Sequence, residues 1–173
     1  MRERFTVRIA TRDDVGSIAR HRAQMFADMG ELPADTYEDL VTQTTQYLDV
    51  ALPAGTYLGW LATADTDPGT VVAGAGVQLR RTLPHPITRG GQRRVAAGRQ
   101  AIVLNVYTEK AWRRRGLAEL LMAHVIEWAR TANIDTLVLH ASAEGRSLYE
   151  RLGFMGTTEM RYRDLDMSPS VRT

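Results

Sequence analysis

The sequence predicts an α/β protein whose mixed sheet of six or seven strands is flanked by helices. Segments with the period of a strand alternate with segments that have the period of a helix. Two strand segments follow one another in the middle of the chain, as in an antiparallel pair, and the last third runs strand, helix, strand, helix, strand. A chain of 173 residues is long enough for one domain with its own core, so we expect a single domain over 1–173.

The composition excludes several classes of protein and site. Hydrophobic residues make up 44% of the chain and charged residues 24%, as in ordinary globular proteins. No apolar run approaches the ~20 residues of a membrane span, and no signal-type segment follows the N-terminus, so we expect a cytoplasmic protein without a membrane partner. Because the chain has no cysteine, disulfides, thiolate metal sites and a cysteine nucleophile are excluded.

The first part of the chain predicts one strand and two helices. Residues 5–9 alternate apolar and polar side chains, as a half-buried strand does. A capping-box pattern at Thr11 and Asp14 opens a helix that we expect to end at Gly30. A second helix is expected over roughly 35–52, because its apolar positions recur with helical spacing.

The middle of the chain predicts a strand pair and then a loop. Strands are expected over 56–64 and 71–81, joined by a turn of Asp, Pro and Gly. Gly74 and Gly76 lie inside the second strand and indicate a bulge or a close backbone contact. Residues 82–98 contain two prolines and three glycines without an apolar period, so we expect a long surface loop that is mobile without ligand.

This middle part is basic: it contains several arginines, and no acidic residue occurs between Gly69 and Thr108. A solvated basic loop explains this, and so does attraction of an anionic ligand, such as a phosphate or an acidic substrate. The arginines are not interleaved with aromatic residues and no nucleic-acid motif is present, which disfavours nucleic acid as the partner.

The last third begins with a strand, a helix and a second strand. The strand over 101–108 has a continuous apolar start that suits a central position in a sheet. An amphipathic helix follows over about 115–132, with Asn133 as its C-terminal cap. The next strand is expected over 136–140, and if it is a parallel neighbour of the strand over 101–108, the connection between them should be right-handed.

The chain is then predicted to close with one more helix and one more strand. A short helix over 144–152 is ended by Gly153, and a final strand is expected over 157–163. Residues 167–173 are expected to be a frayed tail.

The junction of the strand over 101–108 with the next helix predicts an anion site. A strand that passes through an arginine-rich turn into a helix leaves backbone N–H groups and the positive end of the helix dipole facing a ligand. Gly116 has no Cβ to keep a phosphate away from the backbone. We infer a diphosphate as the ligand.

Two signatures in this region resemble those of the GNAT (N-acetyltransferase) superfamily. Residues 113–118, RRRGLA, resemble its Q/R-x-x-G-x-G/A acyl-CoA signature, and residues 147–154, SLYERLGF, resemble its LYxxxGF signature. The signatures stand in the family's order, with Gly116 and Tyr149 33 residues apart and a helix and a strand between them. The resemblance covers 102 to about 162, and it implies the GNAT fold, in which two central strands splay apart at a bulge.

The resemblance also implies an acetyl-CoA site without a metal. The pyrophosphate would be bound by the turn residues Arg113, Arg114, Arg115, Gly116, Leu117 and Ala118. The pantetheine arm would pair with the backbone of Val106, Tyr107 and Thr108, whose N–H groups would also polarise the thioester carbonyl. Ser142 lies where many members have an asparagine that contacts the pantetheine, and a cap on the following helix is the alternative role.

The resemblance makes Tyr149 the proton donor to the departing thiolate, and packing against Phe154 is its alternative role. The four histidines give no firm assignment. His21 and His124 are interpreted as packing or surface residues, whereas His85 and His140 stay open as a substrate contact and a general base. No His, Asp and Glu grouping has metal-ligand spacing.

These observations predict an N-acetyltransferase that moves an acetyl group from acetyl-CoA to an amine of a small molecule or protein. The amine would attack the thioester directly, without a covalent enzyme intermediate. The alternative is a non-catalytic GNAT-fold module that binds acyl-CoA as a sensor or partner domain. The acceptor is left open, because an aminoglycoside, a polyamine, a metabolite amine and a protein N-terminus are all compatible with the sequence. The oligomeric state is also open, and a homodimer is compatible with the sequence.

Overall fold

The computed structural model describes residues 4–160, and the chain divides into two compact units, Met1–His140 and Ala141–Thr173. Short 3-10 turns precede three of the helices of the first unit, at Arg12–Asp14, Ala34–Thr36 and Lys110–Trp112. The prediction of a single domain stays a prediction. The helices and strands of the first unit are β1 (Phe5–Ile9), α1 (Val15–Asp28), α2 (Tyr37–Ala51), β2 (Tyr57–Ala64), β3 (Asp67–Arg81), β4 (His85–Arg89), β5 (Gln92–Ala96), β6 (Arg99–Thr108), α3 (Leu117–Thr131) and β7 (Thr136–Leu139).

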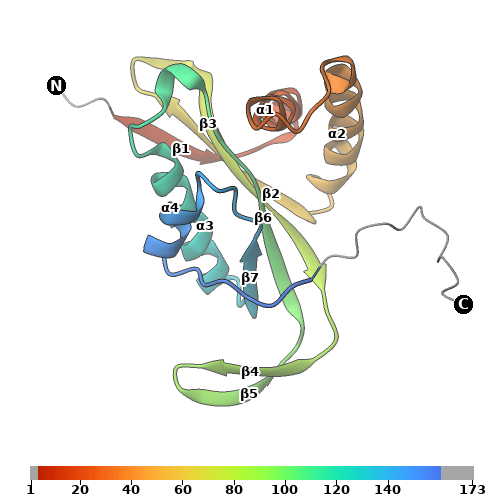
Figure 1. Ribbon diagram of the computed structural model, residues 1–173, viewed down its shortest axis with the longest axis vertical. Coiled ribbons are helices and arrows are strands. Elements are labelled where there is room, and N and C mark those ends of the chain that lie inside the picture. Colours follow the sequence, from red (N-terminus) through yellow and green to blue (C-terminus); the bar gives the residue numbers. More distant parts are fainter. Residues whose placement is uncertain (1–3, 161–173) are drawn as a thin grey trace, which may run out of the picture. The chain divides into compact units, whose positions relative to one another are not determined.

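The main sheet has five strands in the order β1-β2-β3-β6-β7 (Figure 1). All neighbours are antiparallel except β6 and β7, which are parallel. β4 and β5 form a separate two-stranded sheet. The predicted mixed α/β class is therefore confirmed, with the seven described strands divided between a five-stranded sheet and a hairpin.

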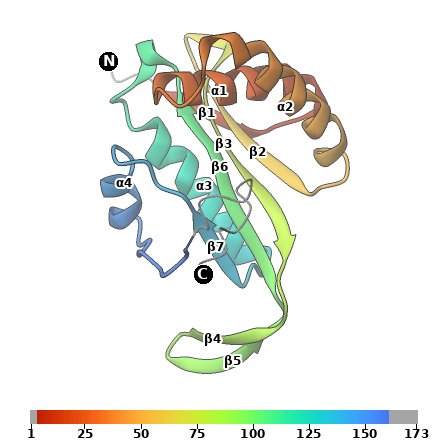
Figure 2. The ribbon, with the colours of Figure 1, turned by 45° about the vertical axis from the view of Figure 1, so that its right-hand side comes forward.

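The hairpin is a correction to the sequence analysis, because residues 82–98 are not the structureless loop that we predicted. β4 pairs with β5 from His85↔Ala96 to Arg89↔Gln92, and the hairpin extends from the ends of β3 and β6 (Figure 2). Gly90 and Gly91 form its turn with φ values of 59° and 77°. A two-residue Gly-Gly turn with positive φ at both positions is a strong hairpin indicator. The prolines and arginines around it hid this indicator in the sequence.

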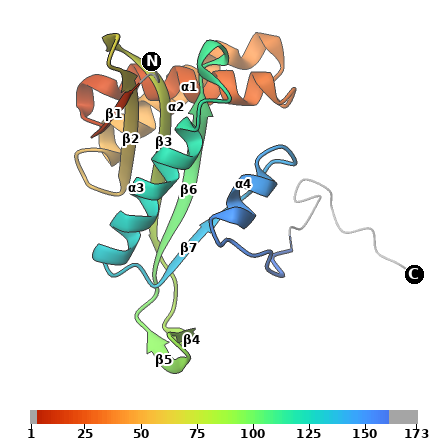
Figure 3. The ribbon, with the colours of Figure 1, turned by 90° about the vertical axis from the view of Figure 1, so that its left-hand side faces the viewer.

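Helices cover both faces of the main sheet. α1 and α2 lie on one face and α3 on the other (Figure 3). On the α1 and α2 side, a buried apolar cluster joins the two helices to the sheet, and its members are Ala10, Val15, Ile18, Leu48, Ala51, Tyr57 and Leu61. On the α3 side, the rings of Trp60 and Trp128 pack edge to face with centroids 5.5 Å apart. The burial of apolar area on both faces stabilises the sheet.

The ends of the helices follow the predicted capping chemistry. The backbone N–H of Thr11 donates to the Asp14 carboxylate at 2.7 Å, which completes the predicted capping box, and Arg8 makes an ion pair with the same carboxylate at 2.7 Å. Gly30 and Asn133 follow the last residues of α1 and α3 with φ values of 72° and 54°, and this left-handed conformation ends a helix.

The second unit contains α4 (Arg146–Arg151), which is shorter than the predicted helix over 144–152. Gly153 follows it with a φ of 93°, as expected for the residue that closes a helix. Residues 157–160 form neither strand nor helix, and the rest of the predicted final strand, 161–163, lies outside the described residues, as does the predicted tail at 167–173.

Candidate functional site

One edge of β6 is paired with a neighbouring strand only along its first half. Residues 100–103 of β6 pair with 136–139 of β7, and beyond that point no strand within residues 4–160 pairs with this edge of β6. The backbone groups of residues 104–108 on that side therefore have no partner strand, which suits a ligand that adds like a strand, although the Thr108 carbonyl there already accepts from Arg113. β7 itself ends at Leu139, where its pairing with β6 ends, and the divergence of two central strands that the resemblance implies stays a prediction.

A bulge lies where β6 opens. Gly74 of β3 faces Tyr107, while Gly76 faces Leu104, so a two-residue step on β3 matches a three-residue step on β6. The irregularity predicted at Gly74 and Gly76 is thus confirmed, and the extra residue is in β6. Asn105 takes up the irregularity in the left-handed region, with a φ of 56°. Asparagine tolerates this region better than most residues.

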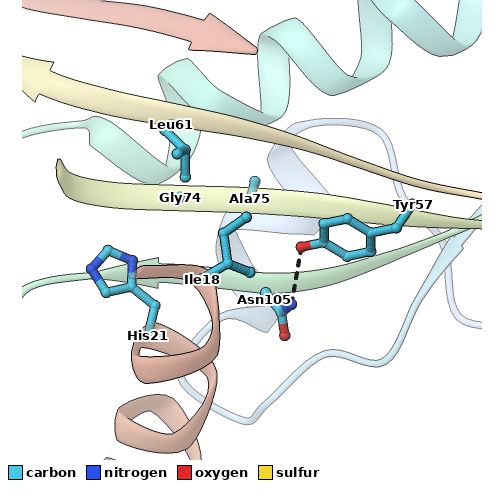
Figure 4. A pocket seen from close by; sticks show the side chains of 7 residues that line it. All are labelled: Ile18, His21, Tyr57, Leu61, Gly74, Ala75 and Asn105. Carbon is cyan, nitrogen blue, oxygen red and sulfur yellow. Dashed lines mark hydrogen bonds between the residues drawn. The ribbon is translucent and has the colours of Figure 1, made fainter. Parts of the chain in front are cut away.

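The bulge directs the Asn105 side chain toward the α1 side of the sheet, where it joins a buried polar cluster. Its Nδ2 donates to the Tyr57 hydroxyl at 3.0 Å (Figure 4), and its Oδ1 accepts from Nη1 of Arg22 at 2.6 Å. Burial raises the pKa of Tyr57 to about 12, so its hydroxyl stays neutral. A Cβ at Gly76 would lie 1.9 Å from the Tyr57 hydroxyl, which explains the glycine there.

His21 and Tyr107 lie beside this cluster. His21 lines a small pocket together with Gly74 and Asn105 (Figure 4), and its Nε2 lies 3.2 Å from Oε1 of Glu109. Burial lowers the pKa of His21, and the carboxylate of Glu109 opposes that shift. Its ring packs against Tyr107 with centroids 5.0 Å apart, and the Tyr107 hydroxyl is buried without a hydrogen-bond partner among residues 4–160.

The turn from β6 to α3 is anchored by one carboxylate of α1. Asp28 contacts the Lys110 ammonium at 3.0 Å, accepts from Gln24 at 2.8 Å and forms a short ion pair with Arg113. Burial opposes its ionisation, but these three hydrogen bonds outweigh burial and hold the pKa of Asp28 below its usual value. Arg113 also donates from Nε to the Thr108 carbonyl at 3.0 Å. Its guanidinium therefore ties the turn to α1 and to the end of β6.

The backbone of this turn presents donors toward the start of α3. Arg114 and Gly116 have φ values of 65° and 82°, and no side chain caps α3 within the described residues. The first helical bond runs from the Leu120 N–H to the Gly116 carbonyl at 3.0 Å, so helix geometry leaves the N–H groups of Leu117 and Ala118 without an acceptor in the helix. A Cβ at Gly116 would meet no atom within 4 Å, so its φ, not space, favours glycine.

The structure brings together nine of the predicted binding residues in the first unit. They are Val106, Tyr107 and Thr108 at the end of β6 and Arg113, Arg114, Arg115, Gly116, Leu117 and Ala118 at the start of α3. The side chains of the three arginines differ in their contacts. Arg113 is bound to Asp28, Arg115 stacks over the Trp112 ring at 4.8 Å, and Arg114 is exposed.

Two further predicted residues lie in the second unit. The Ser142 hydroxyl accepts from the Gly145 N–H at 3.1 Å just before α4, which is the local bond expected of its alternative capping role. Tyr149 packs edge to face on Phe154 with centroids 6.0 Å apart. Burial raises the pKa of Tyr149, so its hydroxyl holds its proton at neutral pH.

The histidines take different positions. His21 is buried, as one of its two expected roles requires, and His124 is exposed on α3. His85 lies on β4 with Nδ1 2.9 Å from the Leu83 carbonyl oxygen. Residues 4–160 contain no group of three or more His, Asp or Glu side chains able to hold a metal ion.

Sequence reasoning missed Arg22, Tyr57 and Asn105. An asparagine inside a predicted strand is unfavourable and marks an irregular position, so Asn105 was open to detection. Arg22 had no distinguishing pattern, because its partner is 83 residues away in the sequence.

Comparison with known proteins decides the family. Residues 26–154 match the family model described as "Acetyltransferase (GNAT) family". The chain belongs to this family. GNAT enzymes are acetyl-CoA-dependent N-acetyltransferases, and this GNAT chain transfers an acetyl group from acetyl-CoA to an amine. No curated protein matches the sequence.

Solved structures with the same fold support the assignment. A GCN5-related N-acetyltransferase from Ralstonia eutropha is 29% identical, with a TM-score of 0.79 over 92% of this chain and 98% of that chain. A predicted acetyltransferase from Clostridium acetobutylicum, solved with acetyl-CoA, is 25% identical, with a TM-score of 0.76 over 95% and 99% of the two chains. Glucosamine-6-phosphate N-acetyltransferase from Arabidopsis thaliana shares the fold at 12% identity, with a TM-score of 0.63 over 95% and 100%. No helix within residues 4–160 is long and apolar enough to cross a membrane.

Proposed function

We propose that this GNAT acetyltransferase binds acetyl-CoA along the open edge of β6 and across the start of α3. The observation that supports this most is the coincidence of two sets of backbone donors. The edge of β6 loses its partner strand after Val103, and the uncapped N-terminus of α3 follows the same strand after one turn. A ligand with a peptide-like arm and a diphosphate fits this pair of features.

The backbone would bind both parts of the co-substrate. The N–H groups of Gly116, Leu117 and Ala118, together with the positive end of α3, would hold the pyrophosphate. The backbone of Val106, Tyr107 and Thr108 would pair with the pantetheine arm and place N–H donors near the thioester carbonyl, where negative charge develops. Because backbone groups make these contacts, the side chain of Thr108 has little influence on them.

The three arginines of the turn would have different tasks. Arg113 acts as a positioning residue, because Asp28 and the Thr108 carbonyl already engage its guanidinium. Arg114 and Arg115 lie on the exposed side of the turn and add positive charge near the phosphates. Arg113 would therefore order the turn, and Arg114 and Arg115 would supply its positive charge.

Tyr149 is proposed to protonate the leaving group. The amine nitrogen attacks the thioester carbonyl carbon, the C–N bond forms, the C–S bond breaks with its electron pair passing to sulfur, and the Tyr149 hydroxyl gives its proton to that sulfur. The proton lost by the amine passes to water or a base. The place of Tyr149 in the LYxxxGF-like run supports this role, and so does its raised pKa, which keeps the hydroxyl protonated. Packing on Phe154 is compatible with both roles.

Ser142 is proposed as a weaker contact. Its hydroxyl accepts from the Gly145 N–H and still has a proton to donate, so one group can order the start of α4 and bond the pantetheine. The cytoplasm stays the proposed compartment, and a homodimer stays compatible with the sequence.

A thiol-release screen tests this function. Free CoA is measured with a thiol-reactive chromophore after purified protein, acetyl-CoA and a panel of amines are mixed. We expect CoA release that depends on one class of amine and is strongly reduced in Gly116→Val. Tight acetyl-CoA binding without release from any amine would support the non-catalytic sensor instead.

A further inference from the structure

Arg22 lies on the face of α1 that packs against the bulge of β6. It follows Ile18 of the apolar core by four residues, so both side chains point toward the sheet. Its Nη1 donates to Asn105 at 2.6 Å, and its guanidinium lies 5.0 Å from the centre of the Phe26 ring. The side chain is half-buried, so the cation is at the boundary of the protein interior.

No carboxylate within residues 4–160 pairs with this guanidinium, whereas three basic side chains near it have such partners. Arg113 and Lys110 share Asp28, and His21 contacts Glu109. Burial lowers the pKa of Arg22, which records the cost of removing this cation from water. A half-buried cation without an anion is unfavourable, so its retention needs a reason.

The cluster fixes Arg22 in place and leaves most of its donors unused. Tyr57 holds Asn105, and Asn105 accepts from one nitrogen of the guanidinium. A guanidinium has five N–H donors in a planar fork that matches a carboxylate, and the hydrogen bond to Asn105 uses one of them. The arrangement holds the guanidinium in place, as a preorganised anion site does.

The position of this site relates it to the acetyl transfer. Asn105 directly precedes Val106, Tyr107 and Thr108, the segment proposed to hold the thioester. A small anion on Arg22 would therefore lie near the segment proposed to hold the thioester. Resting on the proposed function, we propose that Arg22 binds the carboxylate of the acceptor, and that the acceptor is an amino acid or a similar small molecule with its amine a few bonds from a carboxylate.

Matched pairs of acceptors test this inference. Each α-amino acid is compared with its carboxamide, which keeps the amine and removes the charge, and ethanolamine phosphate is included as a non-carboxylate anion. For the preferred side chain, we expect kcat/KM for the acid to exceed that for the amide by roughly tenfold or more, because charge-assisted bidentate bonds are strong. Preference for the phosphate compound over every amino acid would overturn the assignment of a carboxylate.

Two variants at the same position make the test specific. Arg22→Gln removes the charge and keeps a polar side chain, so the ratio of acid to amide should fall to about one, whereas Arg22→Lys should keep part of the preference. Acetyl-CoA affinity by calorimetry and the melting temperature should stay close to wild type in both variants. An unchanged ratio in Arg22→Gln would contradict the proposal.

The failure of this inference differs from failure of the proposed function. Equal use of acids and amides, or acetylation restricted to amines without a carboxylate, would overturn the role of Arg22 and leave the transferase intact. If no amine releases CoA, binding of N-acetyl amino acids to the CoA complex is measured by calorimetry. Absence of that binding, or binding that Arg22→Gln does not weaken, would overturn the inference as well.

Discussion

Two basic regions lie near the end of β6, and they differ in whether their cations are paired with a carboxylate. In the turn before α3, Lys110 and Arg113 are both paired with Asp28. At the bulge, Arg22 has a neutral amide as its hydrogen-bond partner and no carboxylate within the described residues. In the turn, Lys110 and Arg113 thus serve the structure and the proposed ligand contacts are mainly backbone donors, whereas at the bulge the proposed contact is a side chain.

The difference indicates how the two halves of a ternary complex are recognised. The diphosphate and the peptide-like arm of CoA are fixed features of the co-substrate, so backbone donors would suffice to bind them. An acceptor differs between enzymes, and a side chain such as Arg22 can be exchanged without disturbing the sheet. The proposed roles of both regions can be separated by substitution.

The largest effect on kcat is expected at Tyr149, which lies outside both regions and is proposed to give its proton to the leaving thiolate. Tyr149→Phe removes only the hydroxyl, and general acid catalysis contributes about 10²–10⁴-fold, so kcat should fall by roughly tenfold or more. Acetyl-CoA affinity and melting temperature should hardly change. Steady-state kinetics where chemistry is rate-limiting checks this, and a wild-type kcat would assign Tyr149 to packing on Phe154.

At the bulge, Asn105→Asp supplies the carboxylate that Arg22 lacks. The Tyr57 hydroxyl can donate to the new side chain, so the cluster keeps its hydrogen bonds. Because the cation is then neutralised internally, kcat/KM for a carboxylate acceptor should fall by roughly tenfold, while that for its amide changes little. Kinetics on one acid and amide pair measures the contrast, and equal losses for both would indicate general damage to β6.

In the turn, Gly116→Val should weaken acetyl-CoA binding by roughly tenfold, because a β-branched residue resists a positive φ and faces the phosphate. The substitution leaves Arg22 untouched, so the ratio of acid to amide should stay the same. Calorimetric titration measures the affinity. If a folded variant binds acetyl-CoA as the wild type does, the pyrophosphate site is not at α3.

A smaller effect is expected from Asp28→Asn, which releases Lys110 and Arg113. Loss of charge-assisted hydrogen bonds to a largely buried carboxylate should lower the free energy of unfolding by about 1 kcal/mol. Asp49→Asn is the matched control, because Asp49 meets Arg12 at 3.9 Å with both side chains exposed, and it should change stability by less than about 0.5 kcal/mol. Chemical denaturation compares them, and equal losses would remove Asp28 as the anchor.

The same carboxylate makes a prediction about pH. The pKa of Asp28 is lower in the folded protein than in the unfolded chain, so its contribution is complete above the unfolded value of about 4 and is lost as the pH falls through the folded value. The difference in the free energy of unfolding between wild type and Asp28→Asn should therefore shrink as the pH falls below about 4. A difference independent of pH would contradict the assigned role.

Local patterns in the sequence were enough to predict the elements that form the proposed acetyl-CoA region. The strand before Arg113, the helix after Gly116 and the cap at Asn133 depend on neighbours a few residues apart, and all are present. The hairpin of β4 and β5 was missed, although its Gly-Gly turn is also local.

The proposed acceptor side of the site could be found only from the tertiary structure. Tyr57 and Arg22 meet Asn105 across 48 and 83 residues of sequence, and no periodicity records such contacts. The contact also depends on one residue of β6 in a left-handed conformation, which shifts the following side chains relative to β3. Patterns along the chain specify where strands and helices form, but not which polar side chains they bring together.

Amide hydrogen exchange with and without acetyl-CoA tests the central claim most directly, because backbone N–H groups are proposed to bind the co-substrate. We expect slower exchange on binding at Val106, Tyr107 and Thr108 and at Gly116, Leu117 and Ala118, with the β4–β5 hairpin reporting separately whether it closes. Protection confined to other parts of the chain, with these two segments unchanged at saturating acetyl-CoA, would contradict the account.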